Sequence, residues 1–483
     1  MTSPRSQRPA LFRYETLLFL LFVLTLSLVN PWVRGDGVGY YAYVRSFLIE
    51  HDLHFEKDWQ AANPSFKMGR VQSNGEIRVD QYTSTGHLTN HFSVGPAMLW
   101  APFLLVVHLA VLGFNKLGAH IPADGYSRPY LIAMALGTST YGFLGLYLAF
   151  RLARKYFEER WAFLGTLGIW FGSSLPVYMY FNPSWSHAHS AFAVALFLWY
   201  WHRTRERRTA QQWVLLGACS GLMIDVYYPN AVFLLIPVLE ALAAYWRVLG
   251  RNSAAVGRLL ANHVLYSLAV LVTFLPTLLT RKILYGSAFE LGYTERWLWT
   301  SPALKDVLFS TNHGLLSWTP ILIPAVLGLC LFSKADRWMA GYLGVAFLAF
   351  CYLIASYSNW HGISSFGNRF FVSLTPVFIL GLTASVAAFA RLFNRAGRAF
   401  AATGMIVGLF ILWNAGLVFQ WGTHMIPVRG PVSYRAMAYN QVAVVPVQIA
   451  HTLKTYLVQR RPLMEKIERQ DLEQMQSRSP ERD

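Results

Sequence analysis

Long runs of apolar residues, separated by short polar loops, extend over most of the chain. About 20 consecutive apolar residues are needed for a helix to cross a lipid bilayer, and most of these runs approach that length. Such runs with few charges are typical of transmembrane helices. The pattern predicts an all-α integral membrane protein with about 11 transmembrane helices, at about 14–32, 127–150, 161–181, 188–202, 212–227, 229–246, 259–280, 314–333, 338–356, 370–390 and 399–421.

One further apolar run, 95–113, is predicted not to cross the membrane. Lys and Arg collect in the cytoplasmic loops of membrane proteins. If both 95–113 and 127–150 crossed, the basic loop at 151–160 and every later Arg-rich loop would lie outside. If only one of them crosses, all these loops lie inside. The run 95–113 carries Pro96 and Pro102, and we expect it to lie in, or dip into, the outer leaflet, covered by protein.

The same rule orients the two ends of the chain. Arg5, Arg8 and Arg13 precede the first apolar run, which predicts a cytoplasmic N-terminus and an extracytoplasmic first loop. An odd number of crossings then places the C-terminus outside as well.

Two regions follow from this orientation. Residues 1–440 are predicted to form the transmembrane domain, in which 33–126 make a large first outer loop with interfacial helices. Residues 441–483 are predicted to form an extracytoplasmic charged tail. Its last part, 460–483, has so few apolar residues that we expect it to be disordered or bound to a surface.

Composition supports the membrane class and argues against several others. The chain is 54% hydrophobic and 13% charged, whereas soluble domains carry about 25% charged residues. The net charge of +17 lies mainly in short loops between apolar runs, so we assign it to membrane topology and anionic lipid rather than to nucleic acid. The three cysteines lie in apolar runs without paired spacing, which predicts neither disulfides nor a zinc site. The inner loops carry no GxxxxGK[ST] motif, so ATP chemistry is not expected there.

An acidic and aromatic stretch, residues 34–59, directly follows the first apolar run. It holds five of the 24 acidic residues of the chain, namely Asp36, Glu50, Asp52, Glu56 and Asp58. Charged side chains beside a membrane are costly unless they are solvated, paired or used. Asp36 lies closest to the membrane and is the candidate catalytic residue. The alternative is that Asp36 only caps the helix that follows, and that the other four acids form a solvated face.

Other candidate residues lie in loops that the predicted topology places on the same outer side. Arg369 is a lone cation at the outer end of a predicted span, where it either binds an anion or extends to the interface. Trp360 and His361 either stack on a sugar or belong to an interfacial aromatic belt. The remaining candidates for substrate binding are His91, His187 and His189. Because His187 and His189 are two residues apart, they point apart on a helix, and a shared metal is not expected.

These segments resemble those of a known family. GDGVGYYAYVRSFLIEHDLHF (35–55) resembles the first outer loop of GT-C glycosyltransferases, the polyprenyl-phosphate-sugar-dependent enzymes that include protein O-mannosyltransferases and aminoarabinose transferases. HFSVGPAMLWAPF (91–103) looks like the proline-bearing interfacial segment that follows that loop. PSWSHAHSAF (183–192), GSAFELGY (286–293) and WHGISSFGNRF (360–370) resemble segments of bacterial members. The resemblance extends over most of residues 14–440.

The resemblance implies a function and a location. It implies transfer of a sugar, with inversion, from a polyprenyl-phosphate carrier to an acceptor outside the cytoplasm, in a bacterial inner membrane. Asp36 matches the acidic position of the family's first outer loop and would act as the base, and Arg369 would bind the donor phosphate. Several relatives carry two adjacent acids there, whereas Gly37 follows Asp36 here. No cofactor is therefore assigned, and a divalent metal stays an open alternative.

Two other classes of protein remain as alternatives. A transporter or flippase would need ionisable groups in the middle of its spans, and the main ones here, Asp225 and Glu240, lie near predicted ends. A scaffold of an envelope-assembly complex would not need Asp36 and Arg369 to meet on the outer face.

Overall fold

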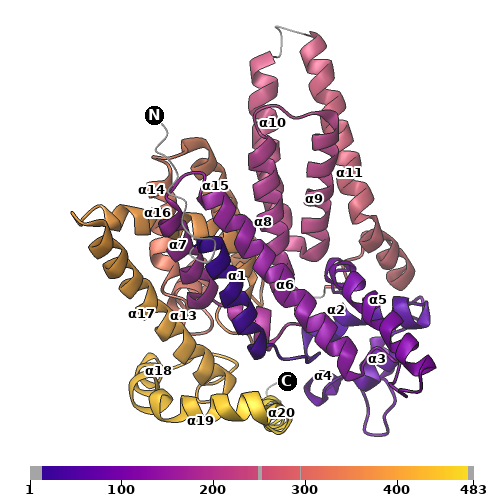
Figure 1. The fold of residues 1–483 in the computed structure, drawn as a ribbon. Helices are drawn as coiled ribbons and strands as arrows, with labels where there is room; N and C mark the ends of the chain where they lie inside the picture. Colours follow the sequence, from indigo (N-terminus) through magenta and orange to yellow (C-terminus); the bar gives the residue numbers. More distant parts are fainter. Residues whose placement is uncertain (1–12, 249–252, 294, 477–483) are drawn as a thin grey trace.

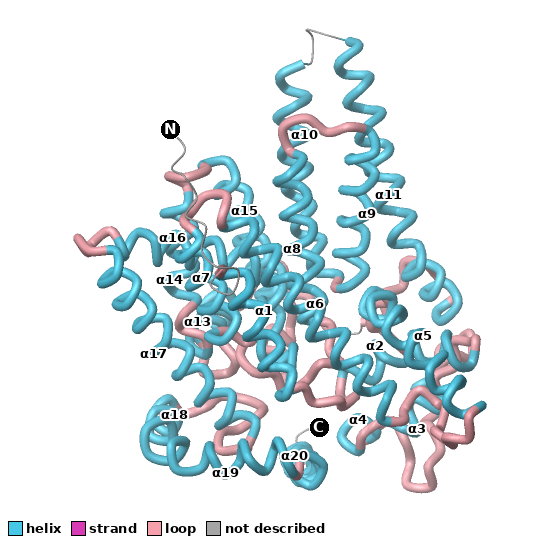
Figure 2. Tube along the Cα trace, in the orientation of Figure 1, coloured by secondary structure: helices cyan, strands magenta, loops and turns pink. Residues whose placement is uncertain are grey.

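The computed structural model describes residues 13–248, 253–293 and 295–476, and it is helical almost throughout (Figures 1 and 2). Arg5 and Arg8, which enter the predicted orientation, and the last residues of the predicted tail lie outside this part of the chain. Over the described ranges no β-strand forms, and three isolated bridges join loop residues. The predicted all-α class is confirmed.

The helices follow one another along the chain, most of them with short connections, and 68–94 and 286–303 are longer stretches between helices. Those of the first half are α1 (Tyr14–Thr25), α2 (Asp36–Arg45), α3 (Glu56–Ala61), α4 (Pro64–Lys67), α5 (Gly95–Lys116), α6 (Arg128–Ala153), α7 (Glu159–Gly172), α8 (His187–Thr204), α9 (Ala210–Val226) and α10 (Leu235–Val248). Those of the second half are α11 (Ser253–Tyr285), α12 (Leu304–Phe309), α13 (Leu315–Trp318), α14 (Leu322–Phe332), α15 (Arg337–Ser356), α16 (Thr375–Ala390), α17 (Ala396–Gly422), α18 (Tyr434–Tyr439), α19 (Val445–Val458) and α20 (Arg460–Gln476).

Seven helical segments of the described chain are long and apolar enough to cross a membrane. They are Gly95–Lys116, Arg128–Ala153, Tyr228–Val248, Ser253–Tyr285, Arg337–Ser356, Arg369–Ala390 and Ala396–Gly422. Tyr14–Leu28 and Leu322–Phe332 are shorter apolar helices. The chain is therefore a multi-pass integral membrane protein, and the number of 11 crossings stays a prediction.

Two of the predicted spans are not single helices. In 161–181, α7 ends at Gly172, and Pro176 precedes a short π-helix, η5 (Val177–Phe181). In 314–333, α13 and α14 are separated at Pro320. Proline has no backbone N–H to donate and clashes with the preceding turn, so each apolar run continues while the helix does not.

Helix α16 lies at the centre of the bundle, where it packs against α14, α7, α6 and α8. Helix α14 comes closest to α16 where each of the two helices carries a glycine. A Cβ atom on Gly328 of α14 would lie 1.8 Å from the carbonyl oxygen of Gly381 in α16, so no larger residue fits there. Burial of apolar surface drives little association between helices inside a membrane, and close packing of small residues takes its place.

Helix α5 lies beside only part of α6. Trp100 Nε1 donates a hydrogen bond to Thr138 Oγ1 near the middle of α6, and the ring of His108 contacts Tyr130 near its start. The first residue of α5, Gly95, abuts the backbone at the C-terminal end of α9. Both ends of α5 thus adjoin helix ends that the topology predicts outside. Its length and composition would also permit a crossing, so the predicted position in the outer leaflet stays a prediction.

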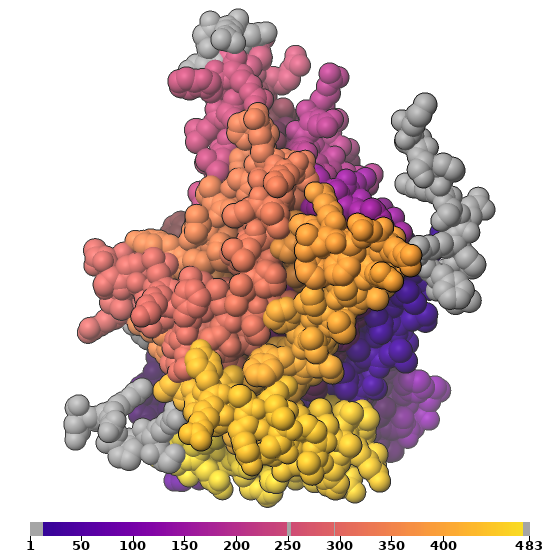
Figure 3. Space-filling model, turned by 90° about the vertical axis from the view of Figure 1, so that its left-hand side faces the viewer, coloured from indigo at the N-terminus to yellow at the C-terminus, as the bar shows by residue number. Residues whose placement is uncertain are grey.

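The remaining helices surround the bundle (Figure 1). Helices α9, α10 and α11 project at one end, and the first-loop helices α2 to α5 gather near the other. Helices α18 to α20 also lie at that other end, beside the end of α17, and loops fill the space between the two groups (Figure 2). The space-filling view shows the C-terminal segment as a continuous base below the later helices (Figure 3). These two peripheral groups enclose the candidate site.

Candidate active site

A cavity of about 1020 Å³ lies between the helical bundle, the first outer loop and the C-terminal helices. Its walls come from segments far apart in the sequence, namely residues 28–40, 65–70, 91–92, 176–187, 227–232, 291–297, 353–370, 411–429 and 449–475. Most of these segments are the loops that the predicted topology brings to one side. The cavity holds the predicted catalytic residue, Asp36.

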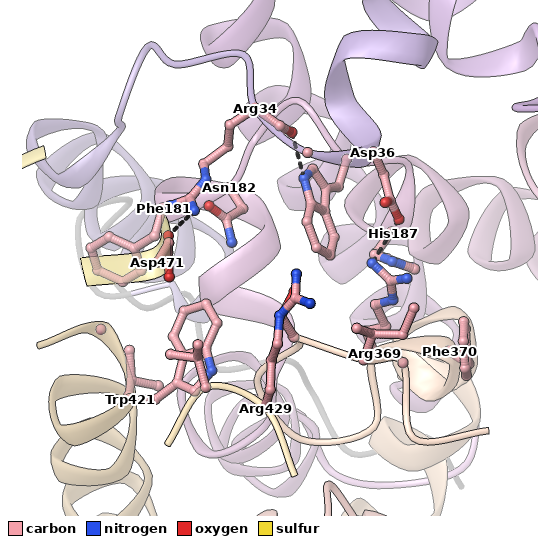
Figure 4. A pocket seen from close by; sticks show the side chains of 18 of the residues that line it. Arg34, Asp36, Phe181, Asn182, His187, Arg369, Phe370, Trp421, Arg429 and Asp471 are labelled. Carbon is pink, nitrogen blue, oxygen red and sulfur yellow. Dashed lines mark hydrogen bonds and ion pairs between the residues drawn. The ribbon is translucent and has the colours of Figure 1, made fainter. Parts of the chain in front are cut away.

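Asp36 and Arg369 form an ion pair at the wall of this cavity (Figure 4). Arg369 Nη1 donates to Asp36 Oδ2 at 2.7 Å, although the two residues are 333 positions apart in the chain. The Asp36 side chain is 32% exposed and that of Arg369 is 11% exposed. A carboxylate open to the cavity is thus paired with a nearly buried guanidinium.

The local structure argues against a capping role for Asp36. Gly35, with φ of 52°, is the N-cap of α2, and no side chain caps this helix end. Asp36 is the first helical residue, and its carboxylate turns to Arg369 instead of to the backbone. An acid in the first turn still interacts favourably with the helix dipole, so its charge is stabilised from two directions.

Arg369 is held in place by aromatic rings and retains a free donor. Its guanidinium carbon lies 4.5 Å from the Trp185 ring centroid and 5.4 Å from that of Phe370. Its Nε has no hydrogen-bond partner among the described residues. A Cβ atom on Gly362 would lie 3.2 Å from this Nε. The side chain is therefore enclosed at the cavity wall and does not extend freely as an interfacial arginine would.

The predicted histidines separate into two environments. His187, the first residue of α8, and His91, before α5, line the cavity. The ring of His187 packs against Tyr178, with centroids 4.8 Å apart, and its Nδ1 has no partner within the described chain. His189 lies away from the cavity lining, between the rings of Trp100 and Tyr141. The two histidines of α8 therefore point apart, as their spacing predicts.

Trp360 and His361 are close to the cavity without lining it. His361 Nδ1 accepts a hydrogen bond from the backbone N–H of Ile363 at 3.0 Å, and the two rings contact edge to face. Burial, followed by the nearby charge of Arg369, lowers the pKa of His361. The structure thus brings Asp36, Arg369, His91 and His187 together and leaves Trp360, His361 and His189 outside the lining.

Several residues of the cavity were not among the sequence candidates. Tyr40 of α2 is buried beside Asp36, and burial raises the pKa of its phenol, which stays protonated. Arg70, Glu295 and Asn182 also line the cavity. Figure 4 shows Arg429 projecting into it between Trp421 and Arg369. Arg70 and Arg429 lie in polar loops without a motif, so no signal in one sequence distinguishes them from solvated residues.

The predicted tail also belongs to this site. Residues 445–458 and 460–476 form α19 and α20, whose apolar side chains line the cavity. Of the two expectations for residues from 460 onward, disorder does not hold for the described part, up to 476, which is helical and packs against other parts of the protein. Helix α20 is strongly charged, yet Glu468 is buried against the first outer loop. The pairing of its acids with that loop explains why a segment so poor in apolar residues is ordered.

The described residues form no obvious metal site. No group of three or more His, Cys, Asp or Glu side chains within the described ranges is placed to hold a metal ion. Gly37 follows Asp36, and the Asp36 carboxylate is paired with the guanidinium of Arg369. A divalent metal stays an open alternative.

Comparisons with known proteins find similarity in structure. No protein-family model matches the chain, and no curated protein matches it. The chain is similar to ArnT from Cupriavidus metallidurans. With undecaprenyl phosphate bound, that structure has a TM-score of 0.49 and 17% identity, over 95% of this chain and 74% of that one. In the apo state the values are 0.47 and 14%, over 89% and 74%.

A second similar protein is the oligosaccharyltransferase of Archaeoglobus fulgidus, solved tethered to an acceptor peptide. Its TM-score is 0.45 and its identity 12%, over 86% of this chain and 56% of that one. This likeness, like that to ArnT, concerns the fold alone. What the present chain does must be inferred from its own residues.

Proposed function

We propose that this protein is a membrane glycosyltransferase of GT-C type, which moves a sugar from a polyprenyl-phosphate carrier to an extracytoplasmic acceptor. The observation that carries the proposal is the Asp36–Arg369 ion pair at the wall of a large cavity between the helical bundle, the first outer loop and the C-terminal helices. Such a transfer needs a base, here Asp36, next to a cationic group that binds the donor phosphate, here Arg369. The acceptor is a glycan, lipid or protein of the cell envelope.

The cavity is divided in a way that suits an amphiphilic donor. One end, which we call the polar end, holds Asp36, Arg369, His91 and Tyr40. The other, which we call the apolar arm, is lined by Leu28, Phe181, Leu453, Tyr456 and Leu463. Three of these residues adjoin one another: the Tyr456 hydroxyl donates to the Leu28 carbonyl oxygen at 2.7 Å, and the Tyr456 ring contacts Phe181. A phosphate at the polar end would leave its hydrocarbon chain in the apolar arm.

Arg369 can hold the donor phosphate without releasing Asp36. Its Nη1 is engaged with the carboxylate and its Nε is buried, so the phosphate would bind at Nη2. A guanidinium presents several donors in one plane, so a single side chain can contact a carboxylate and a phosphate together. The aromatic rings on its faces fix that plane. This geometry would place the sugar, which is bonded to the phosphate, beside the Asp36 carboxylate.

The reaction is a displacement at the anomeric carbon. The acceptor hydroxyl attacks this carbon and forms the new glycosidic bond, while the bond between the carbon and the phosphate oxygen breaks. The proton of the hydroxyl moves to Asp36, and the electron pair of the broken bond stays on the phosphate. Arg369 stabilises the charge that develops there. The products are the glycosylated acceptor and the polyprenyl phosphate, with inversion at the anomeric carbon.

A transporter or flippase of lipid-linked substrates is the second candidate, because the same apolar arm could carry an amphiphile across the membrane. Movement alone leaves the lipid-linked sugar intact, whereas transfer releases polyprenyl phosphate. The two functions therefore differ in their products.

Lipid-linked intermediates provide the first test. A strain that lacks the protein should accumulate one polyprenyl-phosphate sugar, which mass spectrometry of extracted lipids can identify. The purified protein should then release polyprenyl phosphate from that donor when an envelope extract supplies the acceptor, and Asp36→Asn should not. If the donor is moved between leaflets of a vesicle but never consumed, the flippase is correct and the transferase is wrong.

A further inference from the structure

The C-terminal helix α20 contacts the short segment that carries the proposed base. Asp471 of α20 pairs with the guanidinium of Arg34, two residues before Asp36 (Figure 4). The same carboxylate lies 2.9 Å from Nε2 of His424, just after α17. Asp471 thus links the start of the first outer loop to the end of a membrane helix.

A second acid of α20 reaches the same segment through an asparagine. Glu468 Oε1 accepts hydrogen bonds from Asn63 Nδ2 at 2.7 Å and from the backbone N–H of Ser65 at 2.8 Å. Asn63 Oδ1 in turn accepts from the backbone N–H of Gly35 at 3.2 Å. Glu468 Oε2 lies 3.7 Å from Arg34 Nη2. Two acids, one helical turn apart on α20, therefore hold Arg34 and Gly35.

The position of the Asp36 carboxylate depends on these two residues. Gly35 has φ of 52°, a conformation that only glycine adopts easily, and it is the point at which the chain turns into α2. From the other side, Trp185 Nε1 donates to the carbonyl oxygen of Arg34 at 2.9 Å, and Trp185 also stacks on Arg369. The turn is therefore fixed between the bundle and α20.

Energetics also favour a specific role for these acids. Glu468 is 6% exposed, whereas Glu465 and Glu473 of the same helix are exposed. A buried carboxylate loses its hydration and is tolerated only when it is paired and hydrogen-bonded. If α20 only covered the cavity, apolar residues would be expected at positions 468 and 471 in place of the two acids.

We propose that Glu468 and Asp471 are positioning residues for catalysis, which hold Arg34 and Gly35 so that Asp36 meets Arg369 and the acceptor. This inference rests on the proposed role of Asp36 as the base. The C-terminal helix is thereby a part of the active site and not a separate tail.

The test uses the full-length protein in detergent. Glu468→Ala and Asp471→Ala remove the contacts, and Glu468→Gln keeps an oxygen that can accept from Asn63 and Ser65. Glu473→Gln, which removes an exposed acid from the same helix, is the matched control. Since a misplacement of about 1 Å can cost about 100-fold in rate, we expect kcat to fall about 10- to 100-fold in the two alanine variants. The KM for the donor should stay within about twofold, because Arg369 is untouched, and Glu468→Gln should retain most activity.

Hydrogen exchange gives a readout that does not depend on activity. In the peptide that covers residues 33–37, backbone hydrogen exchange should be faster than in wild type in both alanine variants. In Glu473→Gln its rate should be unchanged. Unchanged exchange, or kcat within about twofold of an active wild type, overturns the positioning role. Faster exchange in a protein that transfers no sugar from any donor refutes the proposed function, while the role of α20 in holding this segment stands.

Discussion

Replacement of Asp36 by Asn separates the proposed base from every structural role of this residue. Asn has nearly the same shape, and its side-chain oxygen can still accept the hydrogen bond from Arg369 Nη1, now 2.7 Å from Asp36 Oδ2. It loses the negative charge and the ability to take a proton. A capping role is already absent, because Gly35 is the N-cap of α2 and no side chain caps it.

The effects on rate and on stability should differ in size. A general base contributes about 10²–10⁴-fold to a rate, which is about 3–5 kcal/mol of transition-state stabilisation. Loss of the charge in the first turn of α2 weakens the interaction with the helix dipole by about 0.3–1 kcal/mol. The ion pair is open to the cavity at its Asp36 end, so its loss adds about 1 kcal/mol. Turnover should therefore fall much further than stability.

The assay is release of polyprenyl phosphate by purified protein from the donor that accumulates in the deletion strain. Thermal unfolding is measured on the same samples. Asp80→Asn is the control, since Asp80 is an exposed acid of the same outer loop that pairs with Arg78. We expect Asp36→Asn to lose about 10²–10⁴-fold in kcat while Asp80→Asn behaves as wild type. Turnover of Asp36→Asn near the wild-type value would refute the role of this carboxylate as the base.

Three further predictions address the donor phosphate, the topology and the packing of α5. Arg369→Lys should lose most activity and raise the donor KM, because an ammonium cannot hold Asp36 and a phosphate in one stacked plane; full activity in Arg369→Ala would contradict phosphate binding. In a cysteine-free background, Lys116→Cys should react with an impermeant reagent from outside and Arg151→Cys only after permeabilisation; the reverse pattern, with Arg151→Cys labelled from outside and Lys116→Cys only after permeabilisation, would refute the topology. Gly95→Ala should cost about 1–3 kcal/mol, because its Cβ would lie 2.3 Å from a backbone nitrogen of α9. Gly113→Ala on the same helix should cost little, as nothing lies within 4 Å.

The sequence predicts the membrane helices well where one physical rule determines them. The runs 338–356 and 399–421 correspond closely to α15 and α17, because long apolar segments in a bilayer must satisfy their backbone groups as helices. The same rule fails at Pro176 and Pro320, where the apolar run continues and the helix cannot.

The site is predictable only in part, and for a similar reason. Sidedness places Asp36 and Arg369 on one face, and the fold then brings them into contact. The predicted membrane topology cannot show that α20 packs against the first outer loop, because a strongly charged segment predicts a helix that is exposed to solvent. The burial of Glu468 depends on Asn63, about four hundred residues away, and this pairing exists only in the folded chain.

The last prediction concerns a histidine buried close to the site. His313, between α12 and α13, has no exposed surface and stacks on Trp318, with centroids 4.8 Å apart. Burial, assisted by the charges of His361 and Arg369, lowers its pKa to about 3. In the unfolded chain a histidine has a pKa of about 6.5. Between these two values the unfolded chain binds the proton and the folded protein does not. Stability therefore falls as the pH falls through this window, by up to about 1.4 kcal/mol per pH unit.

His313→Asn should remove this contribution. Asn tolerates the φ of 58° at this position and carries no titrating group in the window. The drop in apparent melting temperature between pH 7 and pH 5 should therefore be smaller in the variant than in the wild type, whatever the variant's stability at pH 7. His451→Asn on α19 is the control, because this histidine is exposed and not buried in the folded chain. Because other groups contribute equally to both proteins, equal drops in His313→Asn and wild type would mean that His313 is protonated in the folded state. Its burial beside Arg369 would then need a different account.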